Sequence, residues 1–203
     1  MIVYVESNYI IELVLQQEQF KSCSAILDLA EKGKIELIIP AFCFTEIYEA
    51  LGRKRSLRKE LANNINTQLD QLSRSALYAE STALFKELVI LLTNSYEQDL
   101  QSLHTLHDRL LSIAQVVPLT DEVLKAASKS RTIYNLEPQD SVVFASTLIH
   151  QSSVSKEEDK CFFNRNSKDF KDPDIIETLK KNNCVSFFNF DDGYKYLIRK
   201  RKQ

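Results

Sequence analysis

Short apolar runs separated by helical patterns constrain the fold of this chain more than any other feature of its sequence. Residues 2–5, 35–40, 161–164 and 184–190 are predicted to be strands, and residues 114–120 have a weaker strand character. The segments between them carry apolar residues at the spacing of a helix. Strands that alternate with helices form a mainly parallel sheet covered by helices. The chain is therefore predicted to be an α/β protein.

A long helical region interrupts this alternation. The helix that begins after residue 40 is expected to end at Gly52. From Arg53 to about Ser112 the chain lacks proline and glycine, and two long helices are expected there, joined at residues 73–81. No linker marks a domain boundary. The sequence thus predicts a single domain over residues 1–203, with a helical elaboration at 53–112 and a basic tail at 199–203.

The composition excludes several classes of function. The chain has only three glycines, so a GxGxxG loop, a Walker A loop and a GxSxG nucleophile elbow are absent. The net charge of -2 gives no general attraction to nucleic acid, so RNA contact would need a local basic patch. No signal peptide or membrane span is recognisable, and a cytoplasmic protein without a membrane partner is expected.

The cysteines are expected to be structural. Cys23, Cys43, Cys161 and Cys184 lie far apart in the sequence beside apolar residues, and no CxxC pair occurs. This distribution favours reduced, buried thiols over a disulfide framework or a zinc site.

Four acidic residues follow the predicted strands. Glu6 closes the first strand, Glu46 lies early in the helix after residue 40, Asp140 lies in the first turn of a helix beginning near Pro138, and Asp169 follows the strand 161–164. Parallel sheets bind ligands outside the carboxyl ends of their strands. Each acid alone could be an ordinary strand-end or helix-start residue.

Together these acids indicate a cation site. Carboxylates held close to one another near a core repel and need a compensating cation. Hard oxygen ligands with few histidines favour Mg²⁺ or Mn²⁺ over zinc. A divalent cation in such a cluster commonly activates water for phosphodiester cleavage.

Four segments carry a resemblance to a known family. "IVYVESN", "IIPAFCFTEIYEAL", "EPQDSVVFASTLIH" and "CFFNRNSKDF" resemble, in order and spacing, the motifs of the PIN domain, the nuclease fold of VapC-type toxins. The resemblance implies a three-layer α/β/α sandwich and a metal-dependent endoribonuclease that cleaves RNA phosphodiester bonds. Membership of the toxin class would further imply an antitoxin protein as partner, and a homodimer.

The same resemblance implies roles for individual residues. By match to the motifs, Glu6, Asp140 and Asp169 would bind Mg²⁺ or Mn²⁺, and Glu46 would bind metal or orient the attacking water. Supporting polar residues would be Asn8, Asn164 and Asn166.

This chain departs from the family pattern at three positions. Glu6 replaces the usual aspartate, Asn164 stands where threonine or serine is common, and Asn166 is neutral where many relatives have an acid. These departures keep open an alternative, a catalytically weak or inactive PIN-like module that binds RNA or protein. A plain α/β protein whose acids bind no metal is a third interpretation.

A basic segment directly follows the helix that carries Glu46. Its side chains could bind RNA phosphates, or could simply form a solvated helix face. They are Arg53, Lys54, Arg55, Arg58 and Lys59. The basic tail could act in the same way.

Overall fold

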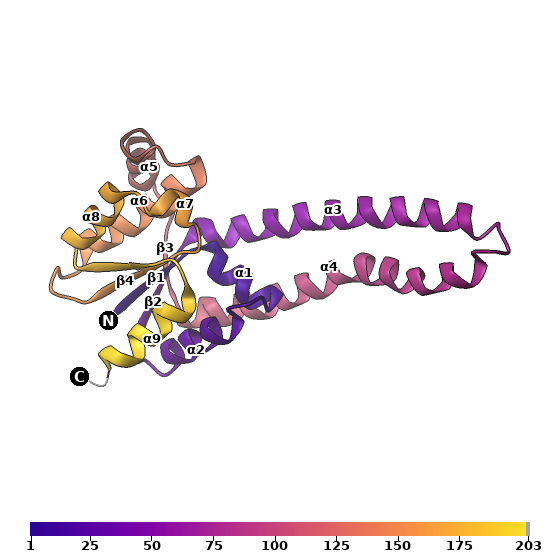
Figure 1. Cartoon of the computed structure of the whole chain (residues 1–203). Coiled ribbons are helices and arrows are strands. Elements are labelled where there is room, and N and C mark those ends of the chain that lie inside the picture. Colours follow the sequence, from indigo (N-terminus) through magenta and orange to yellow (C-terminus); the bar gives the residue numbers. More distant parts are fainter. Residues whose placement is uncertain (202–203) are drawn as a thin grey trace. The chain divides into compact units, whose positions relative to one another are not determined.

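The computed structural model describes residues 1–201, without the side chains of residues 79, 83 and 84. Lys202 and Gln203, at the end of the predicted basic tail, lie outside the described residues. The chain forms two compact units, one made of Met1–Ile47 with Leu106–Gln203 and the other of Tyr48–Thr105. Figure 1 shows the course of the chain through both.

The first unit contains a parallel five-stranded sheet. Its strands are β1 (Ile2–Val5), β2 (Glu36–Pro40), β3 (Gln115–Val117), β4 (Lys160–Phe163) and β5 (Cys184–Phe187). They lie in the order β3-β2-β1-β4-β5, and every neighbouring pair is parallel. The central strand β1 is buried along its whole length, as its apolar sequence predicts. The predicted parallel α/β architecture is confirmed.

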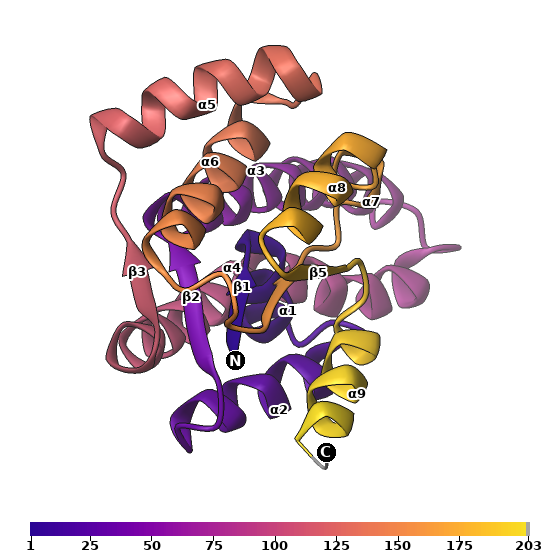
Figure 2. The same ribbon diagram turned by 90° about the vertical axis from the view of Figure 1, so that its left-hand side faces the viewer.

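Helices cover both faces of this sheet. They are α1 (Ser7–Leu15), α2 (Phe20–Glu31), α5 (Asp121–Tyr134), α6 (Pro138–Ser153), α7 (Ser167–Phe170), α8 (Pro173–Lys181) and α9 (Phe190–Lys200). Helices α2 and α9 pack side by side on one face, and α5, α6 and α8 lie over the other, as Figure 2 shows. The result is the expected three-layer α/β/α sandwich.

One glycine permits close packing between a helix and the sheet. The Phe163 ring of β4 lies against Gly193 of α9, where an added Cβ would come within 2.7 Å of the ring carbon Cζ. A side chain at this position would displace the ring or the helix. Glycine therefore sets how closely α9 approaches β4.

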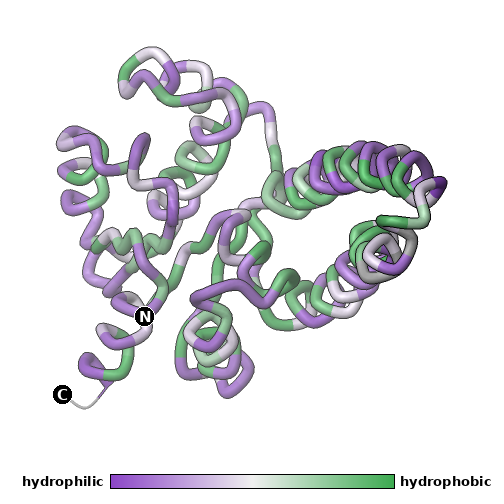
Figure 3. The backbone as a smooth tube through the Cα atoms, turned by 45° about the vertical axis from the view of Figure 1, so that its right-hand side comes forward, coloured by the Kyte–Doolittle hydropathy of each residue, from purple (hydrophilic) through white to green (hydrophobic). Residues whose placement is uncertain are grey.

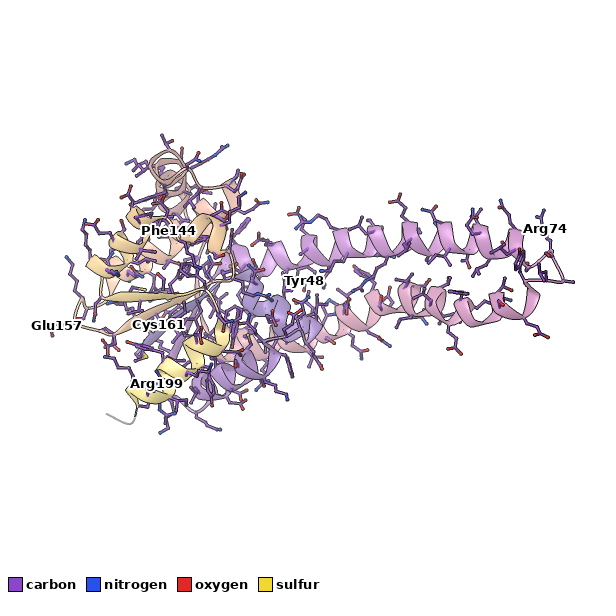
Figure 4. The ribbon with its side chains drawn as sticks, viewed as in Figure 1. Tyr48, Arg74, Phe144, Glu157, Cys161 and Arg199 are labelled. Carbon is purple, nitrogen blue, oxygen red and sulfur yellow. The ribbon has the colours of Figure 1, made fainter. Side chains whose placement is uncertain are left out.

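The cysteines of this unit are buried and free of disulfides, as predicted. Cys161 on β4 is labelled in Figure 4, together with Phe144 on α6. None of the helices in the described part of the chain combines the length and apolar character of a membrane span.

The second unit is built from parts of two long helices, α3 (Ala41–Leu72) and α4 (Ala79–Ile113). The prediction that a helix ends at Gly52 was wrong, because α3 continues through this residue without a break. A glycine inside a helix costs only about 1 kcal/mol relative to alanine, which neighbouring helix-forming residues offset. The helical region predicted at 53–112 is formed by these two helices and the turn at residues 73–78 that joins them.

Polar contacts join the two helices of the second unit. Arg58 forms an ion pair with Asp99 at 2.6 Å and donates a hydrogen bond to Ser95 at 2.9 Å. The Arg55 guanidinium lies 4.6 Å from the centre of the Tyr96 ring, a cation–π contact. Figure 3 shows hydrophobic and hydrophilic residues alternating along each turn of both helices.

Candidate functional site

The acids predicted from the sequence come from four segments of the first unit. Glu6 is the N-cap of α1 directly after β1, Glu46 lies in the second turn of α3 after β2, Asp140 lies in the first turn of α6, and Asp169 lies in α7 after β4. Because β1, β2 and β4 are parallel, their carboxyl ends lie at one edge of the sheet. The fold thus carries Glu6, Glu46 and Asp169 to the same edge, and Asp140 on α6 joins them through a hydrogen bond from Asn166.

Glu6 is the most buried of these acids, with 4% of its surface exposed. Its Oε1 accepts a hydrogen bond from the backbone N–H of Arg165 at 3.3 Å, and its Oε2 accepts one from the Ser7 hydroxyl at 3.3 Å. The pKa of Glu6 is raised from 4.5 to about 7, chiefly by burial and also by the charge of Glu46, while hydrogen bonds from Asn8 and from the Arg165 N–H lower it. Burial of an ionised carboxyl group at this position therefore costs folding stability, and packing alone does not explain why a carboxyl group is here.

Asp140 is electrostatically coupled to two other acids. Its pKa is raised from 3.8 to about 6, chiefly by burial and then by the charges of Asp169 and Glu46, while a hydrogen bond from Asn166 lowers it. Since Glu46 acts on the pKa of both Glu6 and Asp140, the four acids form one interacting group. Such mutual repulsion is typical of functional sites.

Asn166 links two of the carboxylates. Its side-chain Nδ2 donates hydrogen bonds to Oδ2 of Asp140 at 3.0 Å and to Oδ2 of Asp169 at 2.7 Å. Its Oδ1 accepts a hydrogen bond from the Asp169 N–H, so Asn166 also caps α7. The amide hydrogens, which carry partial positive charge, thus stand between two carboxylates where a cation would be expected.

Asp169 is held in place by its neighbour. Phe170 is 1% exposed, and its ring packs against Phe162 of β4 and Phe144 of α6. This anchor fixes the short helix α7 against the sheet edge. The position of Asp169 therefore follows from an aromatic cluster that links three elements.

Asn164 contributes an unpaired donor at the same edge. The residue is 1% exposed, and its Oδ1 accepts a hydrogen bond from the Asn166 N–H at 2.5 Å. Its Nδ2 is one of four buried side-chain atoms without a hydrogen-bond partner in the described part of the chain. A buried donor of this kind is costly unless a ligand oxygen pairs with it.

Sequence reasoning missed the pair formed by Arg165 and Glu12. Glu12 is fully buried in α1 and forms an ion pair with the Arg165 guanidinium. Its Oε2 also accepts a hydrogen bond from the Gln19 N–H at 2.9 Å. The pair ties the loop after β4 to α1, and so holds the Arg165 N–H against Glu6. The signal was present, because an acid on the apolar face of α1 needs a cationic partner.

Comparison with protein-family models matches residues 3–170 to the PIN domain. The chain belongs to the PIN domain family. Among solved structures, the crystal structure of VapBC2 from Rickettsia felis bound to a DNA fragment from their promoter aligns with a TM-score of 0.47. That alignment has 13% sequence identity and covers 92% of this chain and 98% of that chain. A search of curated proteins finds no match.

The donor chemistry of this PIN domain suits a divalent cation, although its side chains do not converge on one point. Four carboxylates and a buried amide supply the hard oxygen ligands that Mg²⁺ and Mn²⁺ prefer. Within residues 1–201, no group of three or more His, Cys, Asp or Glu side chains is close enough to hold an ion. Between Asp140 and Asp169 the Asn166 amide takes the central place. Ligation by these residues would therefore require Asn166 to release its two carboxylate partners.

The basic segment of the PIN domain lies on α3 in the second unit. Three of its residues have partners within that unit: Arg53 pairs with Glu49, and Arg55 and Arg58 contact Tyr96 and Asp99. These contacts support the alternative of a structural helix face for the arginines. RNA contact by the segment stays a prediction.

Proposed function

We propose that this PIN domain is a divalent-metal-dependent endoribonuclease that cleaves RNA phosphodiester bonds. The observation that carries the proposal is the electrostatic coupling of Glu6, Glu46, Asp140 and Asp169 at the carboxyl edge of a parallel sheet. Membership of the PIN domain family supports the same reaction class. The hard oxygen donors point to Mg²⁺ or Mn²⁺ as the cofactor.

Each residue at the edge has a proposed role. Glu6, Asp140 and Asp169 would hold the cation, and Glu46 would either join them or orient the attacking water. A bound cation would lower the pKa of water and offset the charge of the cleaved phosphate. The Arg165 N–H and Asn8 would keep the Glu6 carboxylate in one orientation.

The two asparagines after β4 would have different roles: Asn164 would bind the substrate, and Asn166 would help to assemble the site. The unpaired Nδ2 of Asn164 would donate to a phosphate oxygen, which satisfies a donor that the protein itself leaves without a partner. Asn166 would hold Asp140 and Asp169 together until the cation takes its place. On α3, Lys54 and Lys59 would contact RNA phosphates together with any arginine released from its partner.

The motif resemblance to VapC-type toxins extends the proposal to partners and location. An antitoxin protein would bind and inhibit this chain, the chain would form a homodimer, and both would act in the cytoplasm on cellular RNA.

A non-catalytic PIN module that binds RNA or protein is the second candidate. The neutral Asn166 between two carboxylates favours it, because an amide already satisfies both acids without a metal. In that case RNA binding would persist with a chelator present, and no cleavage would occur.

Incubation of the pure protein with mixed RNAs and Mn²⁺ tests the proposal. Wild type should cleave, Glu6→Gln and Asp140→Asn should not, and EDTA should stop cleavage. Asp174→Asn, which changes an exposed acid in the first turn of α8, serves as the matched control and should cleave normally. Equal cleavage by all four proteins would reveal a contaminating nuclease and overturn the assignment. RNA binding without cleavage would favour the second candidate.

A further inference from the structure

The unit Tyr48–Thr105 contains a pocket of about 690 Å³ that involves part of the basic segment. Both helices of the unit contribute to its walls. Pockets of this volume are typical of sites that hold small organic groups. The lining includes Glu49, Gly52, Arg53, Arg55 and Leu57 of α3 and Tyr96 of α4. These residue types indicate what kind of group the pocket suits.

Gly52 keeps the pocket open beside the helix backbone. Helix α3 continues through this residue, although glycine destabilises a helix relative to alanine. Its backbone does not have the positive φ that favours glycine. Packing does not require glycine either, because an added Cβ would meet no described atom within 4 Å outside its own helix and chain neighbours. Glycine is suited to a position where a ligand lies close to the backbone.

Arg55 and Tyr96 give the pocket a planar surface. The Arg55 guanidinium lies over the Tyr96 ring, 4.6 Å from its centre, so the ring restrains the side chain. Arg55 is nevertheless exposed, and a guanidinium plane also stacks on nucleobases. Leu57, which is 66% exposed, adds apolar surface to the same pocket. A flat ring is therefore the shape that these side chains favour.

Glu49 and Arg53 place an acceptor and donors side by side in the pocket. Their ion pair joins Oε1 of Glu49 to one guanidinium nitrogen of Arg53. In the described part of the chain, Oε2 of Glu49 and the other N–H groups of Arg53 stay available to a ligand. A carboxylate repels a phosphate group, whereas the edge of a nucleobase carries both donors and acceptors. The polar groups thus match a base better than a phosphate.

We propose that this pocket binds an unstacked nucleobase of single-stranded RNA. The base lies against the backbone at Gly52 and stacks on the Arg55 guanidinium, while its edge donates to Glu49 and accepts from Arg53. Because every base has a π-face and an edge with a donor and an acceptor, the pocket binds RNA without strong preference for sequence. The choice of RNA as ligand rests on the proposed function, and base binding adds to the phosphate contacts proposed for Lys54 and Lys59.

Fluorescence anisotropy in EDTA, with the full chain, tests the pocket. The probes are a labelled single-stranded RNA decamer and an abasic decamer that has the same sugar–phosphate chain without bases. Wild type should bind the RNA decamer about fivefold or more tightly than the abasic decamer, as stacking of a base predicts. Gly52→Leu fills the space beside the backbone, so it should remove this difference and leave affinity for the abasic decamer unchanged.

Thermal unfolding separates loss of the pocket from loss of the fold. Gly52→Leu should unfold about 2 °C higher than wild type, because leucine favours the helix and meets no neighbour there. Asn66→Leu, at an exposed position of α3 away from the pocket, is the matched control and should bind both decamers as wild type does.

A second pair of variants separates stacking from charge. Arg55→Lys keeps the positive charge but loses the guanidinium plane, so it should weaken binding of the RNA decamer about fivefold and leave the abasic decamer unaffected. Arg74→Lys is its control. Arg74, labelled in Figure 4, lies in the turn between the two helices and does not line the pocket.

The outcomes distinguish this pocket from the nuclease assignment, because binding is measured without metal or cleavage. Equal wild-type affinity for the two decamers would overturn base binding, even if the protein cleaves RNA, and would point to a protein side chain as the occupant. Unchanged RNA binding by Gly52→Leu, or equal weakening of both decamers, would also overturn it. A wild type that distinguishes the decamers but cleaves no RNA with Mn²⁺ would support the pocket and overturn the nuclease assignment.

Discussion

The burial of Glu6 leads to an unusual stability prediction for Glu6→Gln. Glutamine keeps the shape of the side chain, and its Oε1 can still accept the hydrogen bond from the Arg165 N–H. It removes the charge that burial and Glu46 make unfavourable. In the absence of metal, the variant should therefore be more stable than wild type at alkaline pH.

The size and the pH range of this effect follow from the pKa. Because the folded protein binds the Glu6 proton more tightly than the unfolded chain does, the wild-type fold loses stability as pH rises from about 4.5 to about 7. At about 1.4 kcal/mol for each tenfold change in proton affinity, the full loss is about 3 kcal/mol. The difference between Glu6→Gln and wild type should be close to zero at pH 4, grow between these two values and level off above about pH 8.

This difference is measured by urea unfolding in EDTA at pH 4, 6 and 8, with tyrosine fluorescence as the signal. Addition of Mn²⁺ at pH 8 should stabilise wild type more than Glu6→Gln, since the variant lacks one of the carboxylates proposed to hold the cation. If Glu6→Gln were less stable than wild type at pH 8, or if the difference were the same at all three values, the reasoning from burial would be refuted.

Three further changes probe the surroundings of the site and the basic segment. Asn166→Asp should lower stability in EDTA at pH 8 and strengthen Mn²⁺ binding at least tenfold by calorimetry. The reason is that a carboxylate would replace the amide that donates to Asp140 and Asp169. Unchanged Mn²⁺ binding would contradict the bridging role of Asn166. Arg165→Ala should cost about 3 kcal/mol in urea unfolding by leaving Glu12 buried without its partner, and adding Glu12→Gln should restore part of this, whereas equal single and double variants would exclude the pair. Lys54→Ala with Lys59→Ala should weaken RNA binding uniformly across sequences and flatten its salt dependence in filter-binding assays, and unchanged affinity would leave the segment a structural face.

Much of the fold was predictable because its signals are local. The apolar run that ends at Glu6 forms a strand with a neighbour on each side. A central strand of this kind can be recognised from its own residues alone. The acids that follow strands could be placed at one edge because parallel topology alone brings those ends together. The three-layer arrangement was implied by the resemblance to the PIN domain, and the register of the strands was not predicted.

The features that escaped prediction depend on contacts between distant segments. Gly52 was expected to end a helix, but its neighbours outweigh the modest penalty of a helical glycine. The bridging of Asp140 and Asp169 by Asn166 depends on where α7 packs, which Phe170 decides in three dimensions. A sequence pattern can indicate that an acid is buried, but it does not name the residue that pairs with it.

The central claim is that the four acids bind a divalent cation. The most direct test measures Mn²⁺ binding to the pure protein at pH 8, with electron paramagnetic resonance reporting the concentration of free ion. Wild type should bind Mn²⁺, Asp140→Asn should bind it at least tenfold more weakly, and Asp174→Asn should match wild type. Affinity should fall as pH drops below about 6, where Asp140 gains its proton. Identical Mn²⁺ binding by all three proteins, or none by wild type, would contradict a metal site at this edge.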